Sequence, residues 1–401
     1  MSGERVPAPH QVPGPSVSGD AFAVRVKVSP FVAFFWRDGQ LVCDDPWRHR
    51  QLALTPQAER LLRVFADWQP MSAAKIAGDG AERLAARLVS AGVLIAEDSA
   101  EHHRESELGA WRDLGTVATH FHHATRTHDR DDFADRREDN AALRARAGRQ
   151  PSPYLDRSGA RLTLPPPGRP EGELADVLTA RRSTRDFDRA RSVGAEQLST
   201  LLDWAFGARY VVDVPDLGPT LLKTSPSGGA RHPVEVYPVL RRVDGLRPGV
   251  YHYSVRRHDL ELLGPPPDDT TVEHWCGGQR QAVDAAVLLL YTARLDRTVW
   301  KYPHARAYRA PFLDLGHLGQ TVYLLATALD LGVFFTAATR DEPVERALEL
   351  SWTEEILLGV TGLGIPTEAE RARQTAMRNG GPAGFSFPAG DRNGSQPRFS
   401  E

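Results

Sequence analysis

Cysteine is almost absent from this chain, which has only Cys43 and Cys276 among 401 residues and no CxxC spacing. A disulfide framework or a thiolate metal site is therefore not expected, and a reducing cytoplasm is the predicted compartment. The chain also lacks a strong charge of either sign, since its formal net charge is −3 with 25% charged residues. Such a balance gives no general attraction to nucleic acid or to an anionic membrane.

Long apolar runs are missing as well. The longest candidate, residues 322–338, is interrupted by Asp330 and Gly332, so it predicts a buried helix followed by a strand rather than a membrane span. Residues 1–20 are polar and rich in proline and glycine, without the basic and apolar regions of a signal peptide. We therefore expect neither membrane attachment nor a secretion signal.

The length of the chain predicts more than one domain, because 401 residues exceed what a single small core needs. The run Leu164-Pro165-Pro166-Pro167-Gly168 marks one boundary, since proline-rich chain is extended and incompatible with a helix. Composition divides the chain into four expected parts: a small module at 22–98, a charged helical connector at 99–160, a larger domain at 161–373 and a disordered tail at 374–401.

The N-terminal module has the pattern of a winged-helix domain. Arg37-Asp38-Gly39 separates two apolar runs as in a hairpin, and Thr55-Pro56 is a typical helix start. Two further helices are expected at 73–77 and 81–90, before a returning apolar strand at 93–95. DNA binding is disfavoured, because the last helix carries only two arginines for phosphate contacts. Docking of a peptide or partner, and a plain packing or dimerisation role, both stay open.

Histidine is concentrated in the connector. Six of the fourteen histidines lie there: His102, His103, His120, His122, His123 and His128. Imidazole suits zinc, copper and iron. Adjacent histidines on a helix point about 100° apart, however, and no cysteine or carboxylate spacing completes a ligand set. No metal site is predicted, and the segment is interpreted as a solvated helix.

The larger domain has strands and helices that do not alternate regularly, which predicts an α+β fold rather than a doubly wound one. The expected helices are 171–180, 197–207 and a long helix from Pro311 with its C-cap at Gly332. The expected strands are 234–243, 249–254, 259–263, 285–293 and 355–361. The strand at 285–293 is apolar except for Thr292, so it is expected to be buried on both faces.

A cluster of arginines lies at the end of the first of these helices. Arg181, Arg182 and Arg185 surround Ser183. Guanidinium forks with a hydroxyl match a phosphate monoester and a neighbouring polyol through charge-assisted hydrogen bonds. A solvated basic turn at a helix C-terminus is the plain alternative.

A glycine loop follows at residues 225–233. Gly228-Gly229 lets the backbone approach a flat ligand closely and exposes N–H donors. An ordinary tight loop before a strand is the alternative. The loop is not a dinucleotide fingerprint, because it has no GxGxxG between a strand and a helix.

The third motif is the dipeptide Lys301-Tyr302. It precedes Arg306-Ala307-Tyr308-Arg309 and the helical run Leu313-Asp314-Leu315-Gly316-His317. Asp314 and His317 are three residues apart and share one helix face. They could form a proton relay, although a structural or interface network is the favoured interpretation.

Taken in order, these motifs resemble the SagB/McbC-type azoline dehydrogenases of the nitroreductase-like FMN superfamily. The resemblance covers residues 160–366. It implies an α+β FMN-binding fold with its active sites at a homodimer interface. It also implies oxidation of thiazoline or oxazoline rings in a ribosomally made peptide to thiazole or oxazole, beside a cyclodehydratase partner.

The resemblance assigns roles to residues of this chain. Those that match FMN phosphate and ribityl contacts are Arg181, Arg182, Ser183 and Arg185. Those that match the loop beside the isoalloxazine are Pro226, Ser227, Gly228, Gly229 and Arg231. Lys301 and Tyr302 match the catalytic pair. His232 departs from the family pattern, in which an aromatic or aliphatic residue precedes the proline.

The chemistry explains why such a pair is useful. Aromatising an azoline removes a proton from Cα and a hydride equivalent from Cβ, so a base is needed besides the flavin. A free lysine or tyrosine has a pKa near 10 and is mostly protonated at neutral pH. An ammonium beside the phenol lowers the tyrosine pKa, and desolvation lowers the lysine pKa. Either residue could accept the proton.

Two other functions fit the sequence. The first is an NAD(P)H-dependent nitro or quinone reductase on the same fold. Such an enzyme needs no base at a substrate carbon, and rapid flavin reduction by NADPH would identify it. The second is a flavin-containing docking subunit of a peptide-modifying complex, whose N-terminal module binds a leader peptide or a partner. In that case Lys301→Ala should leave the biological function intact.

Overall fold

The computed structural model describes residues 24–106, 110–125, 143, 149–215 and 217–378. The chain forms two compact units, Met1–Asp132 and Phe133–Glu401. The predicted tail beyond residue 378 and the part of the predicted connector at 126–142 lie outside the described residues. Within the described ranges, no helix combines the length and apolarity needed to cross a membrane.

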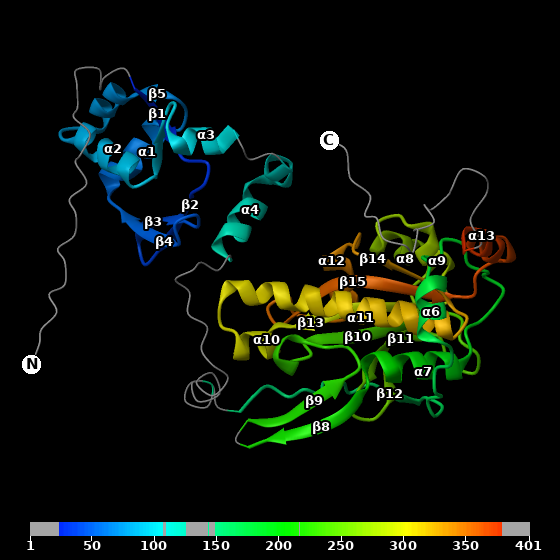
Figure 1. The fold of residues 1–401 in the computed structure, drawn as a ribbon. Coiled ribbons are helices and arrows are strands. Elements are labelled where there is room, and N and C mark those ends of the chain that lie inside the picture. The colour runs from blue at the N-terminus through cyan, green and yellow to red at the C-terminus, as the bar shows by residue number, and fades with distance from the viewer. Residues whose placement is uncertain (1–23, 107–109, 126–142, 144–148, 216, 379–401) are drawn as a thin grey trace, which may run out of the picture. The chain divides into compact units, whose positions relative to one another are not determined.

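The first unit contains two small antiparallel sheets and several helices around one apolar core (Figure 1). Its strands are β1 (Arg25–Val28), β2 (Ala33–Arg37), β3 (Gln40–Asp45), β4 (Arg50–Leu54), β5 (Gln69–Pro70) and β6 (Leu94–Ala96). Its helices are α1 (Pro56–Val64), the 3-10 helix η1 (Met71–Ala77), α2 (Ala81–Ser90), α3 (Ala100–Ser106) and α4 (Ala110–Ala124). The predicted hairpin is β2–β3, and Thr55 caps α1 as expected by accepting from the Ala58 N–H.

Histidines of α3 and α4 pack against aromatic rings of this unit. His102 lies edge-on to Trp68 with ring centroids 4.8 Å apart, and the His123 ring is 4.5 Å from that of Trp47. His120 Nε2 lies 3.0 Å from Asp44 Oδ2. The predicted connector therefore begins within the first unit, and the four-part division of the chain, with its winged-helix-like module, stays a proposal.

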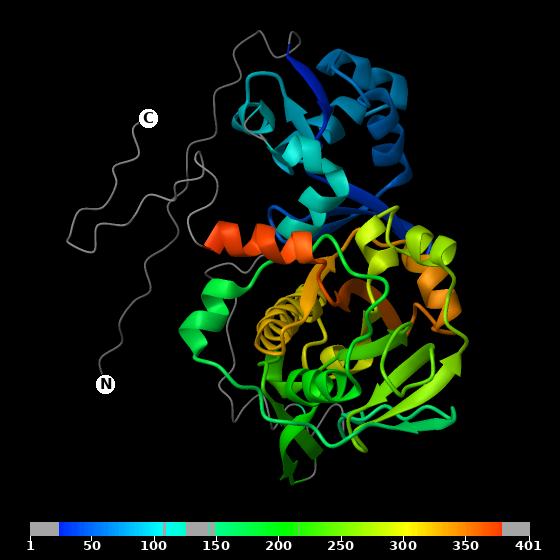
Figure 2. The same ribbon diagram turned by 90° about the vertical axis from the view of Figure 1, so that its right-hand side faces the viewer.

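A seven-stranded sheet forms the centre of the second unit (Figures 1 and 2). Its order is β14-β15-β13-β10-β11-β12-β7, and all neighbours are antiparallel. The strands are β7 (Arg161–Thr163), β10 (Val234–Leu240), β11 (Gly249–Ser254), β12 (Asp259–Gly264), β13 (Val287–Arg294), β14 (Gly332–Thr336) and β15 (Glu355–Gly364). A separate hairpin joins β8 (Ala208–Val214) to β9 (Gly218–Lys223). The antiparallel sheet with separate helices confirms the predicted α+β class.

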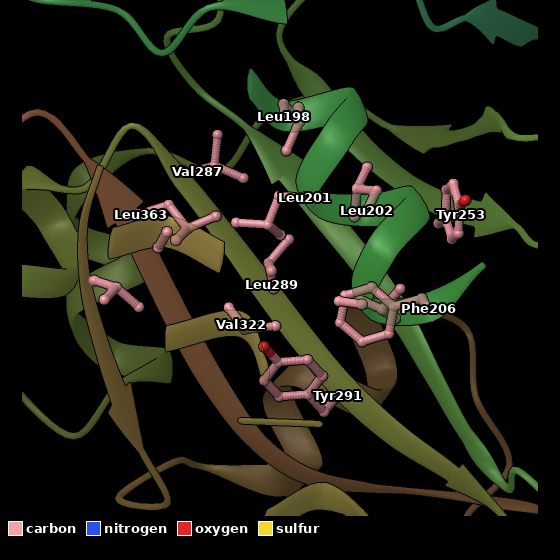
Figure 3. Close-up of a cluster of buried hydrophobic side chains, with 14 of the residues drawn as sticks. Leu198, Leu201, Leu202, Phe206, Tyr253, Val287, Leu289, Tyr291, Val322 and Leu363 are labelled. Atoms are coloured by element: carbon pink, nitrogen blue, oxygen red, sulfur yellow. The ribbon is translucent and has the colours of Figure 1, made fainter. Parts of the chain in front are cut away.

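Helices cover both faces of this sheet. They are α6 (Leu174–Ala180), α7 (Ala195–Phe206), α8 (Asp269–Trp275), α9 (Arg280–Asp284), α10 (Leu295–Lys301), α11 (Arg309–Ala328), α12 (Asp341–Ala347) and α13 (Glu368–Arg378), with 3-10 turns η2 (Gly228–Ala230) and η3 (Ala305–Tyr308). β13 lies between two apolar layers. Its Leu289 and Tyr291 pack in the cluster of α7 and α11 (Figure 3), whereas Leu288 and Leu290 belong to the cluster of α8 and α12. This alternation confirms the prediction of a strand buried on both faces.

The predicted C-cap at Gly332 is wrong. Helix α11 ends at Ala328, and Asp330 takes the left-handed conformation with φ of 57°. Gly332 instead opens β14, where an added Cβ would lie 2.9 Å from both Thr184 and Pro366. Close packing, rather than helix termination, explains this glycine.

Helix α13 continues to Arg378, so the first five residues of the predicted tail, 374–378, are helical. The buried Glu370 anchors this helix. Its carboxylate accepts from Arg373 and from Gln374 within the helix, and from the backbone N–H of Arg185 at 3.4 Å. A buried carboxylate among donors keeps its charge, and the pKa of Glu370 is lowered by these hydrogen bonds although burial opposes them.

Candidate functional site

The glycine loop, residues 225–233, is held by one face of α11. The Ser227 hydroxyl donates to Asp314 Oδ2 at 2.5 Å, and the Gly228 N–H donates to Oδ1 at 3.1 Å. Seven residues, or about two helical turns, further on, Thr321 Oγ1 lies 2.7 Å from Ser225 Oγ. Burial raises the pKa of Asp314, while its two donors favour the charged carboxylate. Asp314 therefore anchors the loop, and His317 faces the same loop at the Pro226 carbonyl, 3.4 Å away.

The backbone of the loop is strained. Gly229, Ala230 and His232 all have positive φ, at 62°, 55° and 45°. A non-glycine residue in this region costs of order 1–3 kcal/mol and persists only where its surroundings hold it. The Arg231 Nε–H donates to the Gly229 carbonyl at 2.9 Å, and the His232 N–H donates to Ser227 Oγ at 2.8 Å. Such a fixed, strained loop is typical of a ligand-binding site.

Lys301 and Tyr302 lie directly against this loop. A Cβ added to Gly229 would lie 2.6 Å from the Tyr302 hydroxyl and 2.8 Å from Lys301 Nζ. The Lys301 ammonium also lies 5.5 Å from the centroid of the Tyr302 ring. The structure therefore brings together the predicted catalytic pair and the predicted flavin loop, which are 72 residues apart in sequence from Gly229 to Lys301.

Gly229→Ala should displace the Lys301-Tyr302 pair, because the added methyl group meets both side chains at a residue that already has positive φ. We expect a loss of about 1–3 kcal/mol in the free energy of unfolding, measured by chemical denaturation. Gly228→Ala is the matched control, since its Cβ would meet only Ala310 at 3.6 Å. Equal destabilisation by the two variants would contradict this packing.

Arg231 braces the loop. Its guanidinium hydrogen-bonds to Gln150 and, at 3.4 Å, to Thr220 on β9, and it lies 5.2 Å from the Trp300 ring centroid. Burial lowers the pKa of Arg231. His232 ties the loop to the same hairpin, because its Nε2–H donates to the Leu221 carbonyl at 3.0 Å. Burial lowers the pKa of His232 to about 3, so the imidazole is neutral.

The arginine cluster, residues 181–185, is divided between two sides of an extended segment. Arg181 lies 5.3 Å from the Tyr323 ring centroid, and the Ser183 hydroxyl lies 2.9 Å from the Tyr323 hydroxyl. Arg182 and Thr184 instead line a cavity of about 320 Å³ on the other side, together with residues of α13. Side chains alternate along an extended chain, which explains the division. The four predicted ligand residues therefore do not form one cluster.

The groups around Arg182 are largely engaged with protein atoms. Arg182 Nη1 donates to the Thr179 carbonyl at 2.8 Å and to the Arg181 carbonyl at 2.7 Å. Arg371, on the same cavity, forms an ion pair with Asp330 at 2.6 Å. Of the two sides of this segment, the one that carries Arg181 and Ser183 is therefore the better candidate to bind the FMN phosphate that the sequence predicts.

The glycine loop and the Arg181–Ser183 side flank α11 on opposite faces. Asp314 contacts the loop and Tyr323 contacts Ser183. These two helix residues are nine positions apart, which corresponds to a rotation of about 180° beyond two full turns and an axial distance of about 13.5 Å. Helix α11 therefore stands between the two predicted halves of the cofactor site within one chain.

Several residues at this site carry no signal that sequence reasoning recognised. Lys223, at the end of β9, lines a small cavity with Ser227, His232 and Asp314, and burial lowers its pKa to about 8. Tyr323 could have been found only by its place in the apolar spacing of α11. Arg297, on α10, has buried partners that are far away in sequence.

Comparisons with known proteins agree with this fold. The nitroreductase family model matches residues 178–365. The nitroreductase homologue MJ1384 of Methanocaldococcus jannaschii is 32% identical over 194 residues, which cover 47% of this chain and 91% of that protein. The chain therefore belongs to the nitroreductase family, a family of α+β oxidoreductases.

Two further similarities involve a trifolitoxin-processing protein and a chain of a microcin synthetase complex. The trifolitoxin-processing protein TfxB of Rhizobium leguminosarum bv. trifolii is 31% identical over 157 residues, which cover 38% of this chain and 42% of TfxB. The chain thus matches less than half the length of TfxB. A chain of the E. coli microcin synthetase McbBCD complex with truncated pro-MccB17 bound is 23% identical, with a TM-score of 0.41, covering 47% of this chain and 70% of that chain.

Proposed function

We propose that this protein is an FMN-dependent dehydrogenase that oxidises thiazoline or oxazoline rings of a ribosomally made peptide to thiazole or oxazole. The observation that carries this proposal is the convergence of Lys301 and Tyr302 on Gly229. A nitro or quinone reductase removes no proton from a substrate carbon, so such a pair would have no task there. Similarity to TfxB, a trifolitoxin-processing protein by name, supports a reaction on a peptide.

The side chains fit FMN as the cofactor. A phosphate monoester requires cationic forks and hydroxyl donors, and Arg181 with Ser183 supplies both at Tyr323. A flat ring requires a surface without side chains, and Gly228, whose added Cβ would meet only Ala310 at 3.6 Å, offers one in the loop beside Lys301. When bound, FMN would supply the acceptor for the hydride that leaves the azoline Cβ.

The chain's own residues would perform the proton transfer. The azoline Cα proton would pass to the Tyr302 phenolate oxygen or to a neutral Lys301 amine, and with loss of the hydride from Cβ the ring gains its second double bond, between Cα and Cβ. A neighbouring ammonium favours a phenolate, and Lys301 Nζ lies 5.5 Å from the Tyr302 ring centroid. Asp314 and Arg231 hold the loop that faces this pair, so the base stays in place during the reaction.

We further propose that the active form is a homodimer in which each flavin site combines the loop and base of one copy with the arginine cluster of the other. Within one chain, α11 separates these two parts. The α10–α11 region also exposes a set of large apolar side chains, which are Val299, Tyr308, Phe312 and Leu313. Leu313 is 65% exposed on the long helix, as expected for a contact with a second copy.

The cellular setting proposed here is a reducing cytoplasm, with a cyclodehydratase as the partner that supplies the azoline. Cys43 and Cys276 are both buried free thiols, which is compatible with that compartment. Azoline rings arise by cyclodehydration of cysteine, serine or threonine residues, so the proposed substrate requires such a reaction beforehand.

Incubation of the FMN-loaded protein with a thiazoline peptide in air tests this function. We expect the peptide to lose two hydrogen atoms per ring, measured by mass spectrometry, without added NADPH. Conversion of a nitroaromatic compound with NADPH, and no change in the peptide, would instead establish the reductase. A protein that takes up no FMN would overturn the cofactor assignment.

Arg181→Ala should weaken FMN binding strongly, whereas Arg182→Ala should not. Arg181 lies beside Ser183 and Tyr323, and Arg182 lines the cavity on the opposite side of the segment. Loss of a charge-assisted hydrogen bond costs about 1.5–3 kcal/mol, or roughly 10–150-fold in the FMN dissociation constant. Fluorescence titration of the apoprotein measures this constant. A larger effect for Arg182→Ala would place the phosphate in the α13 cavity.

A further inference from the structure

We propose that Arg297 is the positioning residue that fixes Lys301 and Tyr302 against the glycine loop. This inference rests on the proposed function of that pair as the base. Arg297 lies four residues before Lys301 on α10, so the two side chains share one face of the helix. Only 4% of Arg297 is exposed.

The guanidinium of Arg297 connects α10 to three other segments. Its Nη1 donates to the His232 carbonyl, at the end of the glycine loop, at 2.9 Å. Its Nε donates to the Ser152 carbonyl at 3.0 Å, and its Nη2 lies 2.6 Å from Glu235 Oε1 on β10. The planar guanidinium of Arg297 thus fixes the distance between helix α10, which carries Lys301, and the glycine loop that Lys301 contacts.

The Glu235 carboxylate, which accepts from Arg297, is itself held in place by further hydrogen bonds. Glu235 Oε2 lies 3.1 Å from His252 Nε2 on β11, and His252 Nδ1 lies 2.9 Å from Glu261 Oε2 on β12. The hydrogen bonds to the two glutamates raise the pKa of His252 even though burial opposes them. The result is a buried series of hydrogen-bonded polar groups, Arg297, Glu235, His252 and Glu261, that crosses three neighbouring strands.

Another side of α10 borders a cavity. Thr298 and Val299 line this open cavity of about 340 Å³ between α10 and the start of α11, and Val299 is 51% exposed. At the helix start the Leu295 N–H donates to the Glu354 carbonyl at 3.0 Å, and the Arg297 guanidinium links the middle of this seven-residue helix to the sheet. A shift of the guanidinium would move the last turn of α10, where Lys301 lies.

A purely structural ion pair would also be buried, so the test must separate positioning from stability. Removing one partner of a buried pair can unfold a protein. Arg297→Lys keeps the charge but cannot reproduce the planar three-way fork. Arg294→Lys is the matched control, because Arg294 is the N-cap residue of the same helix and its shortest ion pair is with the exposed Asp296, the pairs with Glu354 and Glu355 being longer, at 3.9 and 3.8 Å. Glu235→Gln, which keeps a hydrogen-bond acceptor for Arg297, is the second variant if Arg297→Lys does not fold.

The first readout is the anaerobic rate of flavin reduction by a thiazoline peptide. A displacement of about 1 Å at a reacting group can cost roughly 100-fold, so we expect a 10- to 100-fold loss in Arg297→Lys with FMN content unchanged. If Arg297 acts through Lys301, the double variant with Lys301→Ala is no slower than Lys301→Ala alone. A rate within twofold of the parent, or losses that multiply in the double variant, would overturn the inference.

The second readout needs no activity. Amide hydrogen exchange in the segment 295–302 should be faster in Arg297→Lys than in the parent and in Arg294→Lys. Unchanged exchange would overturn the inference even if the protein were an active dehydrogenase. A parent protein that oxidises no azoline would instead end the proposed function, while the exchange experiment would still decide whether Arg297 positions Lys301.

Discussion

Replacement of Lys301 by alanine should abolish azoline oxidation and leave FMN bound. The ammonium lies beside the Tyr302 ring and against Gly229, so its removal takes away either the base or the cation that favours a phenolate. General-base catalysis contributes about 10²–10⁴-fold, and a loss of this size is expected in the single-turnover rate of flavin reduction. FMN should be retained because the phosphate side, Arg181 and Ser183, is unchanged.

Tyrosine variants provide the matched control for this result. Tyr302→Phe removes only the hydroxyl that faces Gly229 and should also slow the reaction. Tyr210→Phe removes a hydroxyl from a side chain on β8 that is 70% exposed, and should not. A Lys301→Ala protein that retains its rate within tenfold would contradict the assignment and favour the docking-subunit function.

Two defective variants should restore activity when they are combined in one dimer and assayed at an FMN concentration too low to fill the Arg181→Ala site. If each site joins the arginine cluster of one copy to the base of the other, a dimer of Arg181→Ala with Lys301→Ala has one site with both defects and one site with none. Random mixing makes half of the dimers mixed, so about one quarter of the parental activity should return. The measurement is the rate of thiazole formation after co-refolding or co-expression of the two variants.

The outcome of this mixing experiment separates the two possible site geometries. If one chain supplied the complete site, every site in a mixed dimer would carry one defect and no activity would return. Arg182→Ala mixed with Lys301→Ala is the control, because Arg182 lies on the other side of its segment and that variant alone should remain active. Absence of recovery for the Arg181 pair would contradict the shared site.

Sequence periodicity was sufficient to predict the elements that have strong, local patterns. The buried strand β13 and the long helix α11 were predicted because their apolar spacing extends over many residues. The hairpin β8–β9 was not predicted, although Tyr210, Val211 and Val212 are typical strand residues. Gly332 was assigned to a helix end because its contacts with Thr184 and Pro366 are tertiary and leave no local pattern.

The candidate site could be predicted as a set of motifs but not as a geometry. Lys301, Tyr302 and the glycine loop were chosen separately from sequence, and only the fold shows that they touch. The arginine cluster was treated as one unit, whereas its extended backbone sends Arg181 and Arg182 to opposite sides. Arg297 had no sequence signal, because its partners Ser152 and His232 lie 145 and 65 positions away.

In the proposed reaction Lys301 and Tyr302 serve an oxidation in which the peptide itself reduces the flavin. The decisive experiment is anaerobic mixing of the FMN-loaded protein with a thiazoline peptide, without NADPH. We expect the absorbance of the oxidised flavin to disappear while one thiazoline per flavin becomes thiazole, with a slower rate when the substrate Cα carries deuterium. A flavin that stays oxidised with the peptide, but is reduced at once by NADPH, would contradict the account.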